Sequence, residues 1–466
     1  MPEKAKVAVI GLGASDLATL KNLAEGFDIT GFERSSSIGG VWSYDVSTTK
    51  TTALANDTPI YPPARQVHQY LQDYALYFKL NDLIETNTEV VKMIRNNKAD
   101  CWELTLRSNA TDSAEIFMRQ FDRVVIATGI NQLPVSPKIK GIERFRGTVI
   151  HSQQYKGPSD FTGKRVLVVG SNNFAGDTAT NLLGVAEKIC SSHRKGTIFL
   201  KRWNKNKPVD HNISWTRLQI MQNYMDYIPK IYNWSIIRLQ NQYHTLRPEW
   251  QVNENLRPFT QCLPLINDEI VGAMQEEKII PVANLTETRR QFSILRDYQD
   301  EFQNTYDTPI TLPGSRADSK PVPKLYQNIF SLNYPDSLAY VCGVGFQMAV
   351  FHVYDLASTA LAQVRKGNIT LPPRDMMQVQ VDSHYQWFSS QWYVWVNETA
   401  GTNVHSKLGY GMQGWRFRLR DRSFCNTLMY GMLSPHLYRL FDGPRRKKWD
   451  GARTEILRVV KEINEM

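Results

Sequence analysis

The sequence lacks any run of about 18 apolar residues, the length that an α-helix needs to cross a membrane. Its cysteines are few and scattered, at positions 101, 190, 262, 342 and 425, without C-x-x-C or metal-site spacing. We therefore expect no membrane span, no bound metal, and buried free thiols in a reducing compartment. The strand-like segment Val7–Ile10 begins so close to Met1 that no room is left for a signal peptide, which predicts a cytoplasmic protein.

Charge of either sign is not gathered into long blocks. The net charge of +10 is spread along the chain, apart from the run Arg445-Arg446-Lys447-Lys448. Such a run is typical of a solvated surface loop, so we expect no nucleic-acid partner. A mildly basic protein suits anionic cofactors. The hydrophobic content of 42% and charged content of 21% are ordinary for a globular protein, and 466 residues leave room for two or three domains.

The N-terminal segment follows the order strand, glycine turn, helix, strand. Val7–Ile10 is a short apolar run, Gly11 and Gly13 form a G-x-G, and a second strand ends at Glu33, about 20 residues further on. Gly11 allows a tight turn, and Gly13 lets backbone N–H groups approach a diphosphate at the start of the helix. A carboxylate at Glu33 can accept hydrogen bonds from a ribose. The segment therefore predicts a Rossmann-type unit that binds a dinucleotide.

Three further segments have the character of cofactor loops and strands. A G-G-x-W sequence, Gly39-Gly40-Val41-Trp42, follows the acidic residue, and an apolar strand leads into Ala127-Thr128-Gly129. A second apolar run, Val166–Val169, leads through Gly170-Ser-Asn172-Asn173-Phe174-Ala-Gly176-Asp177 into a helix start. These features predict a second strand–turn–helix unit after the first.

Between the two units lies the eleven-residue pattern Phe145-Arg-Gly147-Thr-Val-Ile-His151-Ser-Gln-Gln-Tyr155. Taken singly, its aromatic residues are typical of a core and its histidine of a loop. Together with the two turns, the pattern resembles the fingerprint of the class B flavin-dependent monooxygenases, which include flavin-containing monooxygenases and Baeyer–Villiger enzymes. The C-terminal part, above all Phe441–Arg453, is similar to fungal members. The resemblance covers nearly the whole chain.

The resemblance implies an α/β fold with two Rossmann-like dinucleotide-binding domains of FAD and NADPH type, the second altered and truncated. The expected divisions are an FAD domain at 1–157, an NADPH-type domain at 158–312 with a helical insert at about 209–277, and a return to the FAD domain at 313–466. In this family NADPH reduces FAD, and the flavin activates O2 for transfer to a small hydrophobic substrate, so no catalytic triad is expected. The residues implied to bind FAD are Gly11, Gly13, Ser15, Glu33, Arg34, Gly40, Val41, Trp42, Val90, Thr128 and Gly129, and those implied to bind NADPH are Gly170, Asn173 and Arg194.

Several positions depart from the family pattern. The third glycine of the first turn is Asp16, which suits a capping position but places a negative charge where the diphosphate belongs. In the second turn Asn172 replaces a glycine and Phe174 a serine, which predicts weak NADPH binding. Arg194 is placed to meet a 2′-phosphate, and it is equally interpreted as a surface arginine.

Two segments appear shortened beside the family. The stretch between Trp42 and Pro59 is short, and in it Asn56 is either the flavin-side asparagine, with a catalytic role, or the cap of a turn. After Ile279-Ile280 we find no counterpart of the family's strand pair and second A-T-G-Y segment, because residues 286–307 are polar. The second unit is expected to be truncated on this ground.

Three functions are compatible with these residues. We favour a flavin-dependent monooxygenase that oxygenates a small hydrophobic metabolite in fungal secondary metabolism. The departures at Asp16, Asn172 and Phe174 favour instead a redox-neutral cyclase, isomerase or dehydratase on the same fold. The third hypothesis is a non-catalytic binding protein. A homodimer is compatible with the sequence.

Overall fold

The structure is a computed structural model of the chain. It describes residues 3–43, 62–109, 115–129, 139, 142, 145, 147–193, 197–204, 207–208, 211, 213–220, 229–250, 264–282, 302–306, 325–341, 350–383 and 390–465.

A seven-stranded sheet forms the centre of the first unit, in the order β17-β18-β19-β7-β1-β2-β3. Its strands are β1 (Lys6–Ile10), β2 (Asp28–Phe32), β3 (Ile84–Glu85), β7 (Arg123–Ile126), β17 (Leu325–Tyr326), β18 (Phe330–Ser331) and β19 (Leu338–Tyr340). Strand β1 is parallel to both neighbours, with Val9 opposite Gly31 of β2 and Val125 of β7. The central strand is apolar because both of its faces are covered.

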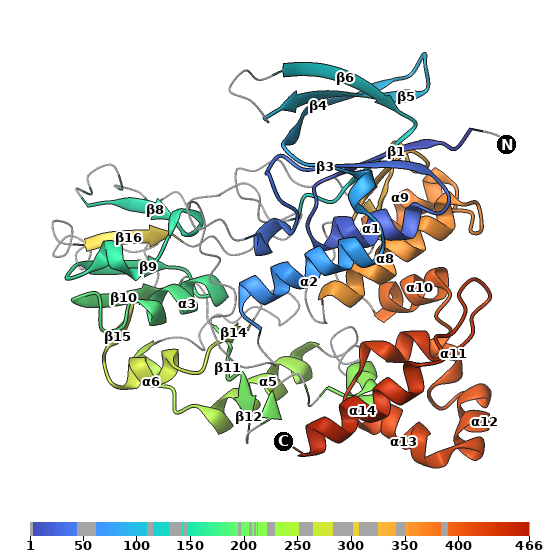
Figure 1. Cartoon of the computed structure of the whole chain (residues 1–466). Coiled ribbons are helices and arrows are strands. Elements are labelled where there is room, and N and C mark those ends of the chain that lie inside the picture. The colour runs from blue at the N-terminus through green and yellow to red at the C-terminus, as the bar shows by residue number, and fades with distance from the viewer. Residues whose placement is uncertain are drawn as a thin grey trace.

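Helices cover one face of this sheet and a small antiparallel sheet covers the other (Figure 1). Helices α1 (Ala14–Leu23) and α8 (Val350–Arg365) pack together and share a core with Val7 and Val9. The opposite side chains, Ala8 and Phe32, pack against the sheet formed by β4 (Thr88–Asn96), β5 (Cys101–Ser108) and β6 (Glu115–Phe121). Helix α2 (Ala64–Tyr77) contacts α1.

A five-stranded sheet forms the centre of the second unit, in the order β15-β10-β9-β16-β8. Its strands are β8 (Val149–His151), β9 (Arg165–Val169), β10 (Lys188–Ser192), β15 (Ile279–Val282) and β16 (Phe302–Tyr306), and all their pairings are parallel. Helix α3 (Asn173–Asn181) follows β9 and packs on this sheet. Figure 1 shows the second sheet set apart from the first.

Strand β16 corrects one expectation. It lies between β9 and β8, with Asn304 opposite both Leu167 and Val149. Sequence analysis found no strand in the polar stretch 286–307, yet residues 302–306 of that stretch form β16. Phe, Thr and Tyr are common in strands, but Phe-Gln-Asn-Thr-Tyr lacks the apolar run by which a buried strand is recognised. The place where a second A-T-G-Y segment would follow, 307–324, lies outside the described residues.

The remaining elements form the insert and the C-terminal part. The insert contains β11 (Phe199–Leu200), β12 (Trp203–Asn204), β13 (Lys207–Pro208), α5 (Pro229–Tyr243), β14 (Leu265–Ile266) and α6 (Ile270–Gln275). The C-terminal helices are α9 (Arg374–Ser383), α10 (Ser390–Ala400), α11 (Val404–Lys407), α12 (Met412–Arg420), α13 (Arg422–Tyr430) and α14 (Ala452–Glu465). Single turns of 3-10 helix are η1 (Gly40–Trp42), η2 (Asn81–Leu83), η4 (Ser152–Gln154), η5 (Pro158–Phe161), η7 (Pro248–Trp250) and η9 (Pro435–Arg439). Trp392 and Val396 of α10 join the core shared by α1 and α8, so the chain returns to the first unit.

The predicted fold class is confirmed, since two largely parallel sheets each carry a strand–turn–helix unit. The domain boundaries stay predictions; β8, which precedes residue 158, pairs in the second sheet. Cys101, Cys190 and Cys425 are buried and free, as predicted, and the other two cysteines lie outside the described residues. Among the described helices, none has the length and apolar character of a membrane span.

Candidate cofactor site

The first glycine turn joins β1 to α1 at the carboxyl end of the parallel strands. Gly11 has a φ of 103°, and its N–H donates to the Phe32 carbonyl at 2.8 Å. A Cβ on Gly11 would lie 3.2 Å from the Cα of Thr128, so a side chain is disfavoured by this tight backbone contact as well as by the positive φ. Gly13 is the N-cap of α1, and its N–H faces the turn. The predicted tight turn is confirmed.

Asp16 lies in the first turn of α1, and its carboxylate folds back into the glycine turn. Its Oδ2 accepts a hydrogen bond from the Gly13 N–H at 2.8 Å and another from the Ser15 hydroxyl at 3.3 Å. This is the reciprocal half of a capping box, which confirms the capping role expected for Asp16. The side chain is only 1% exposed, and burial raises the pKa of the carboxyl well above its usual range.

Glu33 follows β2 and faces the same turn. Its Oε2 accepts from the Leu12 N–H at 3.0 Å, while Oε1 accepts from the N–H and the hydroxyl of Ser35 at 3.0 and 2.8 Å. The Thr88 N–H at the start of β4 donates to the Glu33 carbonyl at 2.7 Å. The strand that carries Val90, β4, therefore begins beside Glu33, and the binding of FAD by Val90 stays a prediction. Arg34 is exposed next to Glu33.

The Gly-Gly-x-Trp loop closes over the turn. The Gly39 N–H donates to the Leu12 carbonyl at 2.8 Å, and a Cβ on Gly40 would lie 3.1 Å from the Cα of Gly13. The two glycine segments therefore approach backbone to backbone. Trp42 is partly buried against the core of the first unit, whereas Val41 is 47% exposed.

The end of β7 forms the third side of the site. The buried Ser15 hydroxyl shares its single hydrogen between Asp16 Oδ2 and the Ala127 carbonyl, which is 3.1 Å away, and so ties the start of α1 to this strand. Gly129 has a φ of 75°, and a Cβ placed there would meet nothing within 4 Å. Thr128 lies beside Gly11, and the binding of FAD by Thr128 and Gly129 stays a prediction.

The second turn, between β9 and α3, has a similar start. Gly170 has a φ of 136° and donates to the Ser192 carbonyl at 2.8 Å. Asn172 is the N-cap of α3, and its Oδ1 accepts from the Asn173 N–H at 2.7 Å. The side-chain oxygen of Asn173 accepts from the Ile266 N–H at 2.8 Å. The predicted NADPH residue Asn173 is thus engaged with β14 through its side chain, and Asn172 caps the helix where a diphosphate would meet it.

Asp177 lies one turn further along α3. Its Oδ1 is 3.3 Å from the Arg202 guanidinium and 3.2 Å from the Asn267 amide. Burial nevertheless raises the pKa of Asp177 to about 6. A Cβ on Gly176 would lie 2.8 Å from Leu265, so this glycine permits close packing of α3 on β14.

The residues of the eleven-residue pattern have structural roles where they are described. The His151 Nδ1 accepts from the Gln153 N–H at 3.1 Å and so caps η4, and burial lowers the pKa of the ring. Tyr155 is 1% exposed and packs on Phe161, and Phe145 packs against the core around Leu167.

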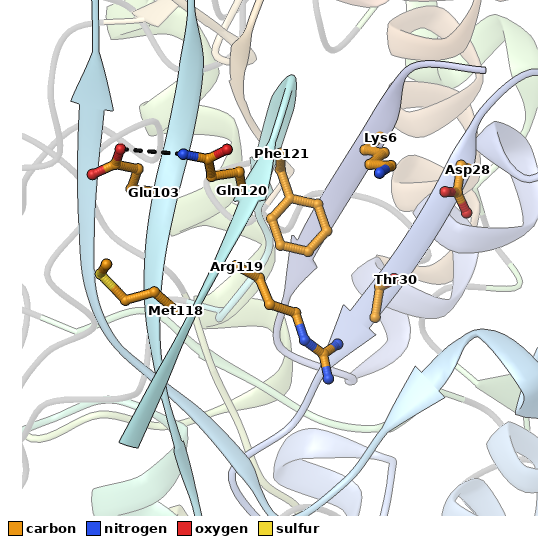
Figure 2. A pocket seen from close by; sticks show the side chains of 8 residues that line it. All are labelled: Lys6, Asp28, Thr30, Glu103, Met118, Arg119, Gln120 and Phe121. Carbon is orange, nitrogen blue, oxygen red and sulfur yellow. Dashed lines mark hydrogen bonds between the residues drawn. The ribbon is translucent and has the colours of Figure 1, made fainter. Parts of the chain in front are cut away.

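The pocket in Figure 2 lies at the opposite end of the strands from the glycine turn. It has a volume of about 560 Å³ and is lined by Lys6, Asp28, Thr30, Glu103, Met118, Arg119, Gln120 and Phe121. Lys6 and Asp28 begin β1 and β2, whereas Gly11 and Glu33 follow the ends of these strands. Because open α/β sheets bind cofactors at the carboxyl ends of their strands, this pocket is separate from the cofactor site.

Comparison with known proteins decides the family. The sequence model of the family described as flavin-binding monooxygenase-like matches residues 4–53 and 50–465. The chain belongs to this family. It is 35% identical to Monooxygenase aurF of Gibberella zeae, over 97% of this chain and 96% of that protein. It is 26% identical to Flavin-containing monooxygenase 1 of Canis lupus familiaris, over 97% and 91%.

Solved structures share the fold of this family member. An open crystal structure of cyclohexanone monooxygenase has a TM-score of 0.57 at 14% identity, covering 85% of this chain and 98% of that one. Polycyclic ketone monooxygenase from Thermothelomyces thermophila has a TM-score of 0.57 at 12% identity, covering 100% and 89%. The predicted resemblance and the enzyme class, a flavin-dependent monooxygenase, are confirmed.

The described residues fit FAD with one conflict. Gly11, Gly13 and Gly40 bring the backbone of the turn and of the loop close together without side chains between them, and Glu33 hydrogen-bonds to the same turn through the Leu12 N–H. The conflict is the Asp16 carboxylate, which takes the Gly13 N–H. Asn56 and Arg194 lie outside the described residues, so their roles stay predictions.

Proposed function

We propose that this protein is an FAD- and NADPH-dependent monooxygenase that transfers one oxygen atom of O2 to a small hydrophobic metabolite in fungal secondary metabolism. The observation that carries the proposal is the meeting of Gly11, Gly13 and Glu33 at the carboxyl ends of β1 and β2, tied together by the hydrogen bond from Leu12 to Glu33. Membership of the family supports the reaction type, and the similarity to a monooxygenase of Gibberella zeae supports the fungal setting.

When bound, the flavin and the nicotinamide supply the redox chemistry and the activation of O2. The chain's own residues bind and orient these groups. Glu33 accepts hydrogen bonds from ribose hydroxyls, and the N-terminus of α1 offers N–H groups and a partial positive charge to the diphosphate. The backbone from Ala127 to Gly129 borders the same site, held to α1 by Ser15.

The test is the origin of the oxygen atom in the product. We expect the FAD-loaded protein, given NADPH and isotopically heavy O2, to add one heavy oxygen atom to at least one member of a panel of small hydrophobic ketones, sulfides and amines. Product that forms without O2 and NADPH, or that carries oxygen from water, would contradict the proposal.

A redox-neutral enzyme on the same fold is the second candidate. The observation that favours it is that both helix starts are capped by a side-chain oxygen of the chain itself, Asp16 Oδ2 in the first turn and Asn172 Oδ1 in the second. Conversion of a substrate under nitrogen, without NADPH, would support this candidate. A cytoplasmic location and a homodimer remain predictions.

A further inference from the structure

The carboxylate of Asp16 occupies the glycine turn in the manner of a bound anion. Its Oδ2 takes the Gly13 N–H, while its Oδ1 is buried and has no hydrogen-bond partner. That unpartnered oxygen lies 3.0 Å from where a Cβ on Gly11 would be, and Oδ2 lies 3.5 Å from the corresponding point on Gly13. The carboxylate therefore stands against both glycines whose missing side chains make room for a diphosphate.

A charged Asp16 and a diphosphate are incompatible in this place. Both are anions, and both use the N–H groups at the start of α1. A like charge within a few ångströms disfavours the ionised form of either group, most strongly in a buried site. The neutral acid removes the repulsion and adds a donor, because a protonated Oδ1 can donate a hydrogen bond to a diphosphate oxygen.

Among the described residues, no positively charged side chain offsets the negative charge of an ionised Asp16. Glu33, after β2, is the charged side chain that acts on Asp16, and its sign is the same. The end of β7 presents the Ala127 and Thr128 backbone, and the loop at Gly40 presents backbone as well. Lys21, further along α1, is paired with Asp355 of α8. Across the Gly39 turn, the His68 ring of α2 is engaged with the Ile38 carbonyl at 2.9 Å.

We propose that Asp16 is a proton-dependent gate of the FAD site: the diphosphate enters the turn only when the Asp16 carboxyl is neutral, so that FAD binds together with one proton. The proposal rests on the proposed function, because it takes FAD as the ligand of the first turn. It explains how a buried acid is compatible with a dinucleotide turn, and it makes cofactor loading sensitive to pH. Burial and the charge of Glu33 raise the pKa of Asp16, whereas the hydrogen bonds from Gly13 and Ser15 lower it. Burial has the larger effect, so Asp16 stays neutral to higher pH than an exposed aspartate.

The experiment is a titration of the apoprotein with FAD, followed by flavin fluorescence, at a series of pH values across the whole range in which the protein stays folded. We expect the affinity of the wild type to fall by up to about tenfold per pH unit above the pKa of Asp16, as one-proton linkage requires. Asp16→Asn, which is isosteric and cannot ionise, and Asp16→Gly should both show no such fall. Asp28→Asn, at the opposite end of β2, is the matched control and should keep the wild-type slope. If the affinity for FAD falls with pH equally steeply in the wild type and in Asp16→Asn, the proposed gate is wrong.

A second measurement does not depend on the variants. Calorimetry of FAD binding to the wild type, in buffers with different ionisation heats, counts the protons taken up. We expect an uptake that rises toward one proton per FAD as the pH increases through the pKa of Asp16. FAD binding without proton uptake across the range would overturn the gate and leave the flavin assignment intact. Failure of the wild type and both Asp16 variants to bind FAD at any pH would overturn the flavin assignment, and the gate with it.

Discussion

At the residue scale, Asp16 and Glu33 act on the same dinucleotide turn in opposite ways. Glu33 has both carboxylate oxygens directed to groups of the turn and the following loop, Leu12 and Ser35. Asp16 takes an N–H that the diphosphate needs. In the function proposed above, Glu33 belongs to the binding surface, whereas Asp16 regulates access to it.

Glu33→Ala should weaken FAD binding. The variant loses a charge-assisted hydrogen bond to the ribose, worth on the order of 1.5–3 kcal/mol, or roughly ten- to a hundred-fold in affinity. The dissociation constant of FAD, measured by fluorescence titration, checks this. Glu85→Ala is the control, because Glu85 is the last residue of the neighbouring strand β3 but pairs with Arg119. A Glu33→Ala protein that binds FAD as tightly as the wild type would show that the ribose assignment is wrong.

Asp16 should also make the apoprotein less stable as the pH rises. The folded state raises the pKa of Asp16, so between the ordinary carboxyl range and the folded pKa the folded chain binds more protons than the unfolded chain. The free energy of unfolding therefore falls with pH in that window and levels off above the folded pKa. Asp16→Asn should lack this fall, so its stability relative to the wild type should grow with pH. Urea unfolding at a series of pH values checks this, and a constant difference would speak against a buried titrating carboxyl.

At the scale of the elements, a partly buried ion network joins α1, which carries the first glycine turn, to α8. Lys21 of α1 pairs with Asp355 of α8, and Arg446 and Arg439 lie 3.2 and 3.9 Å from the same carboxylate. Burial alone would raise the pKa of Asp355, but Lys21 and Arg446 outweigh it and hold the pKa well below its usual range. Sequence analysis missed this network because Lys21 and Asp355 are 334 positions apart, and each residue alone is typical of a surface helix.

Asp355→Asn should destabilise the protein by about 1–3 kcal/mol, because it leaves the partly buried Lys21 and Arg446 without their carboxylate partner. The free energy of unfolding in urea is the measurement. Arg458→Ala in α14 is the control, since Arg458 pairs with Glu455 and Glu462 at the surface, and its loss should leave the unfolding midpoint nearly unchanged. An Asp355→Asn protein as stable as this control would show that the network does not hold α1 in place.

The double variant Asn172→Gly with Phe174→Ser should tighten NADPH. It frees the Asn173 N–H that the Asn172 side chain now occupies and removes a bulky ring. Restoring one backbone hydrogen bond to a diphosphate corresponds to about 1–3 kcal/mol, or roughly ten- to a hundred-fold in affinity. Stopped-flow reduction of the flavin is the measurement, with Asn181→Gly at the other end of α3 as the control. A wild type that is reduced as fast as the double variant would show the altered turn to be harmless. Absence of reduction in both would support the redox-neutral enzyme.

At the scale of the whole molecule, the sequence predicted those structural features whose signal lies within a short segment of the chain. The order β1, Gly11, Gly13, α1, β2 and Glu33 was read correctly, because each signal lies within one strand–turn–helix unit. Strand β16 was missed, because Phe-Gln-Asn-Thr-Tyr has no apolar run, and its neighbours β8 and β9 lie far from it in the sequence. The self-capping by Asn172 could have been suspected, since asparagine is a strong N-cap residue. Distant contacts such as Lys21 with Asp355 leave no local signal.

The visible absorption spectrum of the purified protein tests most directly the claim that it is a flavin-dependent monooxygenase. The protein is saturated with FAD at a pH where Asp16 is neutral, and is then mixed with NADPH without oxygen. A flavin-dependent monooxygenase should be yellow after removal of free FAD, should bleach with NADPH, and should regain its colour in air. A protein that remains colourless after exposure to FAD, or whose bound flavin stays oxidised in excess NADPH, would contradict the assignment.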